Sequence, residues 1–466
     1  MTDCDVCIIG SGAGGGPVAW TLARQGRSVI VLEKGPWFSE QDFYKDELAC
    51  CRRSVYTPNL RDEQHVIEER AGDGGWNAMS TSESGRDFWN GNCVGGSSNF
   101  MSGYFHRLKP VDFRQLSEFG PIEGANIVDW PISYDDLEPW YARVEEIIGV
   151  SGKIEPHPAI EPRSTPDFPY PPTAEHPVSA WIDAACDELG YHSLRVPRAI
   201  LSQPVEKRRG CEYSGYCGSY GCSSGAKGSA RVALLDDTLA TGHCDIRPRA
   251  KAHRLVSDEK GRVVAAEYFD RDGSLRQVTA RTFVVACQAI ETSRLLLRSN
   301  GPRFPGGLAN NNGQVGRNLL FSAGGSGGGD LVYADLDDTR AEQLRTMGPF
   351  VNRALDDWYV IDDPALPGGR VKGGIVDFLL RHPNPIARGA SARWGDDGLV
   401  WGKPLKRRLE NWFRLDRRVN FEAFVDWLPV DSCGLSWKTI RGRLWWERPG
   451  LSWESPWSTR VMSWKG

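Results

Sequence analysis

Two glycine-rich segments have the residue types and spacing that let a protein backbone approach a phosphorylated ligand. The first, Gly10-Ser11-Gly12-Ala13-Gly14-Gly15, follows an apolar run at 5–9 and precedes a helical pattern. In a strand-turn-helix unit of this kind, Gly10 allows the tight turn and Gly12 lets the backbone approach a pyrophosphate, while Gly15 lets helix and strand pack closely. The helix N-terminus then offers unpaired N–H donors and a partial positive charge to the phosphates. This segment predicts a dinucleotide site.

A carboxylate stands where the second strand of such a unit would end. Residues 28–32 have the pattern of that strand, and Glu33 follows it. At this position a carboxylate can accept hydrogen bonds from both ribose hydroxyls, and it disfavours a 2′-phosphate. An ordinary flexible loop is the alternative for the glycines, but it does not explain the ordered succession of strand, turn, helix, strand and Glu33. These residues do not distinguish NAD from FAD.

The second glycine-rich segment is Gly91-Asn92-Cys93-Val94-Gly95-Gly96-Ser97-Ser98. Paired glycines followed by small hydroxyl residues let the main chain approach a flat ring and offer N–H and O–H donors to a ligand. A glycine- and serine-rich surface loop is the alternative interpretation. The candidate ligand contacts in this segment are Gly95, Gly96, Ser97 and Ser98.

Three cysteines, Cys211, Cys217 and Cys222, lie close together in a stretch rich in glycine. Thiolates at such spacing can ligate an iron–sulfur cluster, and the glycines would let the loop wrap around it. A disulfide, a zinc site short of one ligand and free thiols are the alternatives.

The composition excludes several classes of function. The chain has 466 residues, a formal net charge of −4 and scattered basic residues, so it offers nucleic acid no electrostatic footprint. Its apolar runs are strand-sized and far below the roughly 20 residues that cross a bilayer, so we expect no transmembrane segment. The N-terminus lacks the features of a signal peptide, which predicts a cytoplasmic chain; export with a signal-bearing partner subunit stays open.

The two glycine-rich segments and two later blocks together resemble the glucose-methanol-choline (GMC) family of FAD-dependent oxidoreductases, and within it the bacterial dehydrogenase-like branch. One later block, 129–141, leads into a helix that Ser133 can cap. The other, 246–318, contains alternating strands, a hairpin at Asp272-Gly273 and a strand that runs into Gln288. Many flavoproteins have glycine where Gln288 stands, and this departure weighs against a close approach of that turn to the cofactor.

The resemblance implies an α/β fold: a Rossmann-like FAD-binding domain (a parallel sheet with helices) joined to an α+β substrate domain with an antiparallel sheet. The FAD-binding domain would comprise residues 1–152 and 206–323, and the substrate or cap domain residues 153–205 and 324–432. FAD would contact Gly10, Gly12, Gly15, Glu33, Gly95, Gly96, Ser97 and Ser98.

The resemblance also implies oxidation of the CH–OH group of an alcohol or sugar-like substrate, with hydride transfer to flavin N5, by a dehydrogenase rather than an oxidase. A cytochrome or a quinone would then accept the electrons. Membrane-associated dehydrogenases of the family hold a 3Fe-4S cluster in a cysteine loop, which makes Cys211, Cys217 and Cys222 its candidate ligands. Related sequences often have a fourth cysteine where this chain has Ser214.

The catalytic base is unassigned. The family has a catalytic histidine near its C-terminus, but no histidine follows His382 in this chain. His106 lies after the second glycine-rich segment and could line the site, although a lone histidine is more often structural. Two other functions therefore stay open: a non-catalytic, truncated FAD-binding fragment or complex subunit, and an NAD-dependent dehydrogenase, which explains only the first glycine-rich unit.

The tail at 433–466 departs from the family pattern. Its tryptophans follow neither a helical nor an alternating period, and arginines and prolines separate them. We favour a shifted reading frame near Cys433 that has replaced the native family sequence. A tryptophan-rich segment that binds a partner is the alternative. The tryptophans are Trp437, Trp445, Trp446, Trp453, Trp457 and Trp464.

Overall fold

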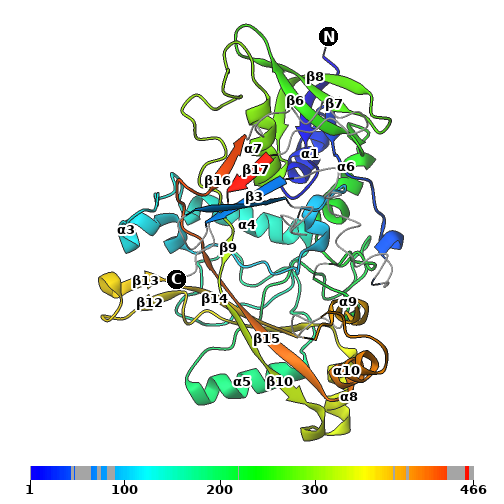
Figure 1. The fold of residues 1–466 in the computed structure, drawn as a ribbon, viewed down its shortest axis with the longest axis vertical. Helices are drawn as coiled ribbons and strands as arrows, with labels where there is room; N and C mark the ends of the chain where they lie inside the picture. The colour runs from blue at the N-terminus through cyan, green and yellow to red at the C-terminus, as the bar shows by residue number, and fades with distance from the viewer. Residues whose placement is uncertain are drawn as a thin grey trace.

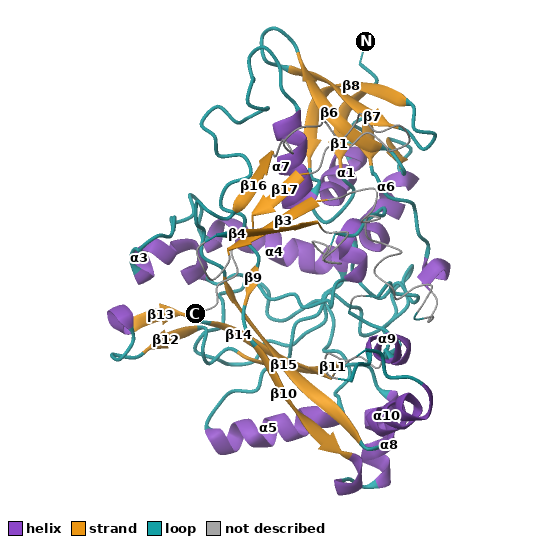
Figure 2. Cartoon of the chain, viewed as in Figure 1, coloured by secondary structure: helices purple, strands orange, loops and turns teal. Residues whose placement is uncertain are grey.

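The computed structural model describes residues 2–43, 47, 65–70, 75–80, 90–218, 220–380, 384–394, 398–437 and 457–460. Figure 1 places an α/β unit, which contains the N-terminus, at one end of the molecule, and an antiparallel sheet with its covering helices at the other. Loops occupy much of the space between the two (Figure 2). The α/β fold with a second, antiparallel sheet is therefore as the sequence predicts.

The first sheet has the strand order β5, β2, β1, β8, β7, β6. β5, β2, β1 and β8 run parallel, whereas β7 and β6 continue the sheet in antiparallel fashion. The sheet is thus mixed rather than wholly parallel, because the predicted hairpin at Asp272-Gly273 reverses the chain between β7 and β8; Gly273 takes φ +80° there. The bounds are β1 Cys4–Ile9, β2 Val29–Leu32, β5 Cys244–Arg247, β6 Lys251–Ser257, β7 Val263–Phe269 and β8 Leu275–Val285.

Both faces of this sheet are covered, which explains why β1 is apolar along nearly its whole length. Successive side chains of a strand point to opposite faces. Ile8 packs in the cluster that includes α1 (Gly15–Arg24), and Ile9 packs in the cluster that includes α7 (Gln288–Arg298). The glycine turn at the end of β1 is therefore anchored on both sides.

Helix α4 (Tyr134–Ile148) has the ends that its sequence predicts. The Ser133 hydroxyl accepts a hydrogen bond from the backbone N–H of Asp136 (3.3 Å), and the Asp136 carboxylate accepts one from the backbone N–H of Ser133 (2.8 Å). This capping box satisfies N–H groups that the first helical turn leaves unpaired. Gly149 ends the helix at φ +81°. Shorter helices in this half of the chain are α3 Gln115–Phe119 and α6 Asp236–Ala240.

The second sheet has the antiparallel order β10, β15, β14, β11, and β9 adds to the end of β15. One of its faces carries Leu380, which packs with Val178 of α5 and Leu344 of α8. The bounds of its strands are β9 Ser322–Ala323, β10 Ser326–Val332, β11 Phe350–Leu355, β14 Gly374–Leu380 and β15 Asp416–Asp426. Strands β12 (Val360–Asp362) and β13 (Arg370–Lys372) form a separate two-stranded antiparallel sheet. The bounds of the helices are α5 Pro177–Leu189, α8 Asp338–Thr346, α9 Pro385–Ser391 and α10 Gly402–Arg414.

The first residues of the tail join the core of the α/β unit. Cys433 and Leu435 are buried in a cluster with Ile290 and Leu319, and the backbone N–H of Leu435 donates to the carbonyl of Gly316 (2.7 Å). The reading-frame hypothesis and the domain boundary at 433 stay predictions.

A small sheet contains the other described part of the tail. Its order is β16, β17, β3, β4, and Trp437 pairs with Trp457 across β16 and β17. The remaining four tail tryptophans lie outside the described residues. The bounds are β3 His65–Arg70, β4 Trp76–Ser80, β16 Gly434–Trp437 and β17 Trp457–Arg460.

Among the described helices, none combines the length and the apolar character that crossing a membrane requires.

Candidate dinucleotide-binding site

A groove opens at the carboxyl ends of β1 and β2, where parallel sheets bind their ligands. It brings together the two glycine-rich segments and the start of α7, which are far apart in sequence. Of the predicted contacts, Gly10, Gly12, Glu33, Gly96, Ser97 and Ser98 line this groove. Gly15 lies beneath it at the start of α1, and Gly95 adjoins Gly96 in the second turn.

The three predicted glycines of the first turn have different roles. Gly10 takes φ +95°, and a Cβ there would overlap the carbonyl oxygen of Ala286. A Cβ on Gly15 would overlap the carbonyl oxygen of Gly10. At Gly12, by contrast, the nearest atom to a Cβ is the Cα of Gly96, 3.8 Å away. Gly10 and Gly15 are therefore required by the fold, whereas Gly12 could carry a Cβ at ordinary contact distance. Its missing side chain keeps backbone exposed to the groove, as the close approach of a diphosphate requires.

The second turn sits directly over the first. Gly95 and Gly96 take φ +91° and +56°, a region that favours glycine. The Ser97 hydroxyl accepts from the backbone N–H of Gly91 (2.8 Å), and the Ser98 hydroxyl donates to the carbonyl of Gly95 (2.5 Å). Both predicted serines thus shape the turn with their hydroxyls in addition to lining the groove.

Glu33 is buried at the end of β2, and its carboxylate is held in place by Ser11. One carboxylate oxygen accepts from the Ser11 hydroxyl (2.7 Å) and backbone N–H (3.1 Å), and the other accepts from the Gly35 N–H (3.0 Å). Burial raises the pKa of Glu33, although these hydrogen bonds oppose the shift. A carboxylate has about four acceptor positions; three are used, so one stays available to a ribose hydroxyl.

Ser11 is a functional residue that the sequence pattern does not reveal. Its hydroxyl donates to Glu33 and also accepts from the backbone N–H of Gly95 (3.0 Å). It therefore ties the acidic residue, the first turn and the second turn into one unit. The only sign of this role in the sequence is that Ser11, a small hydroxyl residue, stands inside the first glycine turn.

The turn into α7 does approach the groove. Gln288 takes φ +70°, the left-handed conformation for which glycine is the usual choice, and it lines the groove next to Cys287. Its side-chain oxygen accepts from the backbone N–H of Ile290 (2.9 Å), which holds the start of the helix. The geometry therefore does not support the expectation that Gln288 keeps this turn away from the ligand groove.

This groove fits a dinucleotide in three respects: backbone without a side chain at Gly12, the N-terminus of α1 after the first turn and a buried carboxylate at Glu33. Comparison with known proteins identifies the family to which the chain belongs. The family model described as GMC oxidoreductase matches residues 71–322. The chain belongs to the GMC oxidoreductase family.

Several curated relatives of this GMC chain are enzymes. It is 34% identical to paromamine 6'-oxidase of Streptomyces fradiae, covering 82% of this chain and 68% of that protein. It is 32% identical to 2-methyl-1,2-propanediol dehydrogenase of Mycolicibacterium austroafricanum (68% and 54% covered) and 27% identical to the fructose dehydrogenase large subunit of Gluconobacter japonicus (73% and 64%). The chain thus spans between 54% and 68% of the length of these relatives.

Solved structures agree on the fold. Formate oxidase from Aspergillus oryzae superposes with a TM-score of 0.55 at 15% identity, covering 98% of this chain and 77% of that one. Identity at this level supports the fold and nothing finer.

The three cysteines of the GMC chain's cysteine loop line one cavity, together with tyrosines and Lys227. Burial raises the pKa of Cys211 to about 11. Burial also acts on Cys222, but the Lys227 ammonium and nearby hydrogen bonds outweigh it and lower that thiol's pKa. Within the described part of the chain, the sulfur atoms of Cys211, Cys217 and Cys222 do not form a group all within 4.8 Å of one another. That spacing excludes one metal ion shared by the three thiolates, whereas an iron–sulfur cluster binds each thiolate through a different iron atom. The described cysteines are free thiols, and the iron–sulfur cluster stays a prediction.

His106 lies away from this cavity, where the loop after the second turn meets β14. Its Nε2 is 3.2 Å from the Asp377 carboxylate, which is fully buried. Burial alone would lower the pKa of His106, but the Asp377 charge and hydrogen bond outweigh it and raise that pKa. Its role here is to bridge the two halves of the molecule.

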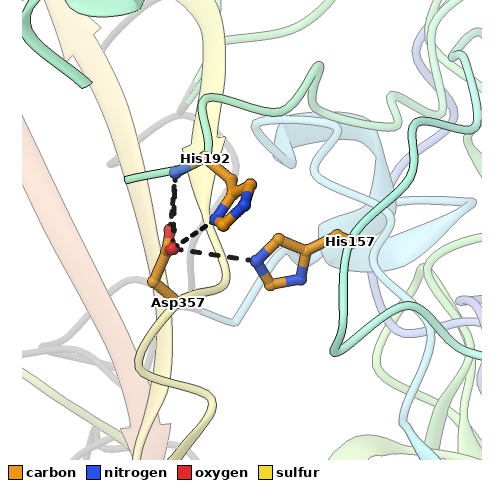
Figure 3. Close-up of side chains that lie close together, drawn as sticks. All are labelled: His157, His192 and Asp357. Atoms are coloured by element: carbon orange, nitrogen blue, oxygen red, sulfur yellow. Dashed lines mark hydrogen bonds and ion pairs between the residues drawn. The ribbon is translucent and has the colours of Figure 1, made fainter. Parts of the chain in front are cut away.

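Two histidines and a carboxylate lie close together elsewhere in the chain: His157, His192 and Asp357 (Figure 3). The Asp357 carboxylate lies 2.7 Å from His192 Nδ1 and 3.9 Å from His157 Nε2. However, the Ala159 backbone N–H donates to His157 Nδ1 (3.0 Å). That nitrogen therefore lacks a proton, Nε2 carries it, and no lone pair on His157 faces the carboxylate. A metal-bound histidine normally donates through its other ring nitrogen, and His157 cannot do so. We interpret the cluster as a contact between loops, in which His192 and Asp357 are hydrogen-bonded and His157 packs against His192.

Proposed function

We propose that this chain binds FAD in the groove and contributes to an oxidoreductase that acts on the CH–OH group of an alcohol or sugar-like substrate. Family membership supports oxidoreductase chemistry, and the relatives named above oxidise paromamine, a diol and fructose. FAD is supported by the resemblance of the two glycine turns to those of the FAD-dependent GMC family, to which the chain belongs. The single observation that carries the proposal is the groove at the ends of β1 and β2, which is lined by Gly12, Gly96 and the buried Glu33.

The chain's own residues would bind and orient the cofactor. Backbone at Gly12 and Gly96 would hold the diphosphate, because neither residue has a side chain, and the N–H groups at the start of α1 would donate to it. Glu33 takes a ribose hydroxyl at its remaining acceptor position. Bound FAD would supply the hydride acceptor, flavin N5. We assign no general base among the described residues.

We further propose a dehydrogenase whose electrons pass to a cytochrome or a quinone. The support is the resemblance to the bacterial dehydrogenase-like branch and the likeness to the large subunit of fructose dehydrogenase, a name that itself indicates a multi-subunit enzyme. Relatives named as oxidases make molecular oxygen the alternative acceptor.

The test is an anaerobic visible spectrum of the purified chain, recorded during titration with alcohols and sugars, for the natural sequence and for Gly12→Val. A Cβ at Gly12 would make ordinary contact with the Cα of Gly96, 3.8 Å away, and the methyl groups of valine would extend into the groove that Gly12 lines. We therefore expect flavin affinity to fall about tenfold or more. Gly306→Val is the matched control, because its Cβ would meet only Asn310, 3.9 Å away and outside the groove.

Each outcome separates the candidates. Flavin that bleaches with an alcohol supports the enzyme, and flavin that never bleaches supports a non-catalytic binding fragment or complex subunit. A colourless protein that binds NAD would favour the NAD-dependent dehydrogenase. Equal flavin content in the Gly12 variant and the natural chain would contradict the assignment of the groove.

A further inference from the structure

Large apolar side chains are exposed around helices α9 and α10. Figure 1 shows the two helices next to each other at the edge of the molecule, beside the second sheet. We call the described residues 384–394 and 398–415, which contain both helices, the α9–α10 surface. Single exposed apolar residues are normal, but several within one short stretch mark an interaction site. Here they are Ile386, Trp394, Leu399, Trp401 and Leu415, which are between 46% and 78% exposed.

Two short paired segments direct some of these side chains to solvent. The backbone N–H of Val400 donates to the carbonyl of Ala392 (2.9 Å), and Arg393 and Leu399 form an antiparallel bridge. Side chains alternate between the two faces of an extended segment. The buried Ala392 and Val400 therefore fill the inner face, and Leu399 and Trp401 share the outer one.

Helix α10 adds positive charge directly after Trp401. Its one acid, Glu410, pairs with Lys406 (4.0 Å). Within the described part of the chain, the side chains of Lys403, Arg407 and Arg414 make no hydrogen bond or ion pair. Residues 384–415 contain seven lysines and arginines but three acids, whereas the whole chain has a net charge of −4. The scattered distribution of basic residues expected from the sequence therefore does not hold for this surface.

The apolar face of α10 is already used within the fold. Leu405, Leu409 and Trp412 recur at the spacing that places them on one face of the helix. A Cβ on Gly389 of α9 would lie 3.7 Å from Leu409 Cδ1, so this face packs on α9. The opposite face, which carries the three cations without partners, points to solvent.

Tryptophan beside basic residues favours a membrane surface over a protein partner. Lysine is depleted in protein–protein interfaces, whereas lysine and arginine attract anionic headgroups and tryptophan prefers the membrane–water boundary. We propose that the α9–α10 surface binds an anionic phospholipid membrane, with Leu399 and Trp401 among the headgroups and the α10 cations on the phosphates. The described residues of this surface do not line the dinucleotide groove, so the inference is independent of the proposed function.

The test is co-sedimentation of the full chain with vesicles of phosphatidylcholine alone and of an equimolar mixture with phosphatidylserine. We expect binding to the anionic vesicles to be about tenfold stronger or more, and to weaken with added salt. Lys403→Gln combined with Arg407→Gln should reduce it about tenfold or more, since each basic residue contributes about fivefold. Trp401→Ala should reduce it about tenfold through lost apolar contact.

Matched controls remove the same residue types elsewhere. Trp140→Ala removes a tryptophan of α4 that is 59% exposed. Lys260→Gln combined with Arg271→Gln removes two exposed cations near the first sheet. Both controls should bind anionic vesicles as the natural chain does, and thermal melting verifies that every variant folds.

Equal binding to the two kinds of vesicle, or no binding, would overturn the inference. A preference for anionic vesicles that survives both the double substitution and Trp401→Ala would place the contact elsewhere and overturn it as well. A dimer in sedimentation equilibrium that Trp401→Ala dissociates, without vesicle binding, would assign the surface to a second copy of the chain instead.

Discussion

Glycines with positive φ do not all serve the same purpose, and substitutions can separate their roles. Gly10 and Gly26 both have positive φ, +95° and +76°, but a Cβ at Gly10 would overlap Ala286 whereas one at Gly26 meets nothing within 4 Å. Gly26→Ala should therefore cost only the left-handed backbone strain, about 1 kcal/mol. Gly10→Ala should cost about 3 kcal/mol or more, because overlap adds to that strain. Urea unfolding of both variants measures the difference; equal losses would show that the overlap relaxes freely.

His106 gives the molecule a pH-dependent contact. Because its folded-state pKa is raised above the ordinary 6.5 by Asp377 in spite of burial, its contribution to stability is complete below the unfolded pKa and is lost as pH rises through the folded one. His106→Gln should lower the free energy of unfolding by about 1–3 kcal/mol at pH 6, and by less at pH 9.

His176 provides the comparison for that experiment. Burial lowers its folded-state pKa to about 4, so the pH dependence has the opposite sign: at pH 6 the unfolded chain binds a proton that the folded state excludes. His176→Ala should therefore lower the free energy of unfolding by less at pH 6 than at pH 9. A His106 variant whose loss did not change with pH would exclude the ion pair.

At the scale of elements, the sequence predicts those structures that a few neighbouring residues determine. The β1-turn-α1 unit, the Ser133 cap of α4 and the Asp272-Gly273 hairpin each follow from a few neighbouring residues. The pairing of Asp377 with Glu422 depends instead on the register of two strands separated by a long insertion, which periodicity does not fix. The sequence pattern does not reveal the role of Ser11 for a similar reason, because the two partners of its hydroxyl are 22 and 84 residues away.

The start of the tail is a second element that its composition concealed. The irregular spacing of the tail tryptophans does not predict core packing. Leu435 is nevertheless only 7% exposed and packs with Ile290 and Leu319. Leu435→Ala should therefore destabilise the chain by about 2–4 kcal/mol. Leu428→Ala, at a residue 39% exposed, should cost much less. Chemical denaturation compares them, and similar small losses would mean that residues from 433 onward do not belong to the core.

At the scale of the whole molecule, the loop after the second glycine turn ties the two sheets together. Lys109 forms a buried ion pair with Asp356 and also donates to the carbonyl of Ala159 (2.5 Å). Asp112 accepts from the Tyr359 hydroxyl and pairs with Lys372 (3.3 Å). The residues that follow the second glycine turn thus contact the segment after β11 and strand β13, so we expect occupancy of the groove to influence the stability of the antiparallel half of the molecule.

Calorimetric unfolding can test this coupling. We expect a single cooperative transition whose Tm rises with added FAD, since a ligand at a thousand times its Kd stabilises by about 4 kcal/mol. Lys109→Met should leave Asp356 buried without a partner, at a cost of about 3–5 kcal/mol, and should split the transition so that only one part responds to FAD. Lys207→Met, which removes an exposed lysine paired with Asp237, is the control. If the natural chain already melts in two steps, with only one sensitive to FAD, the loop does not couple the sheets and the two regions act as independent units.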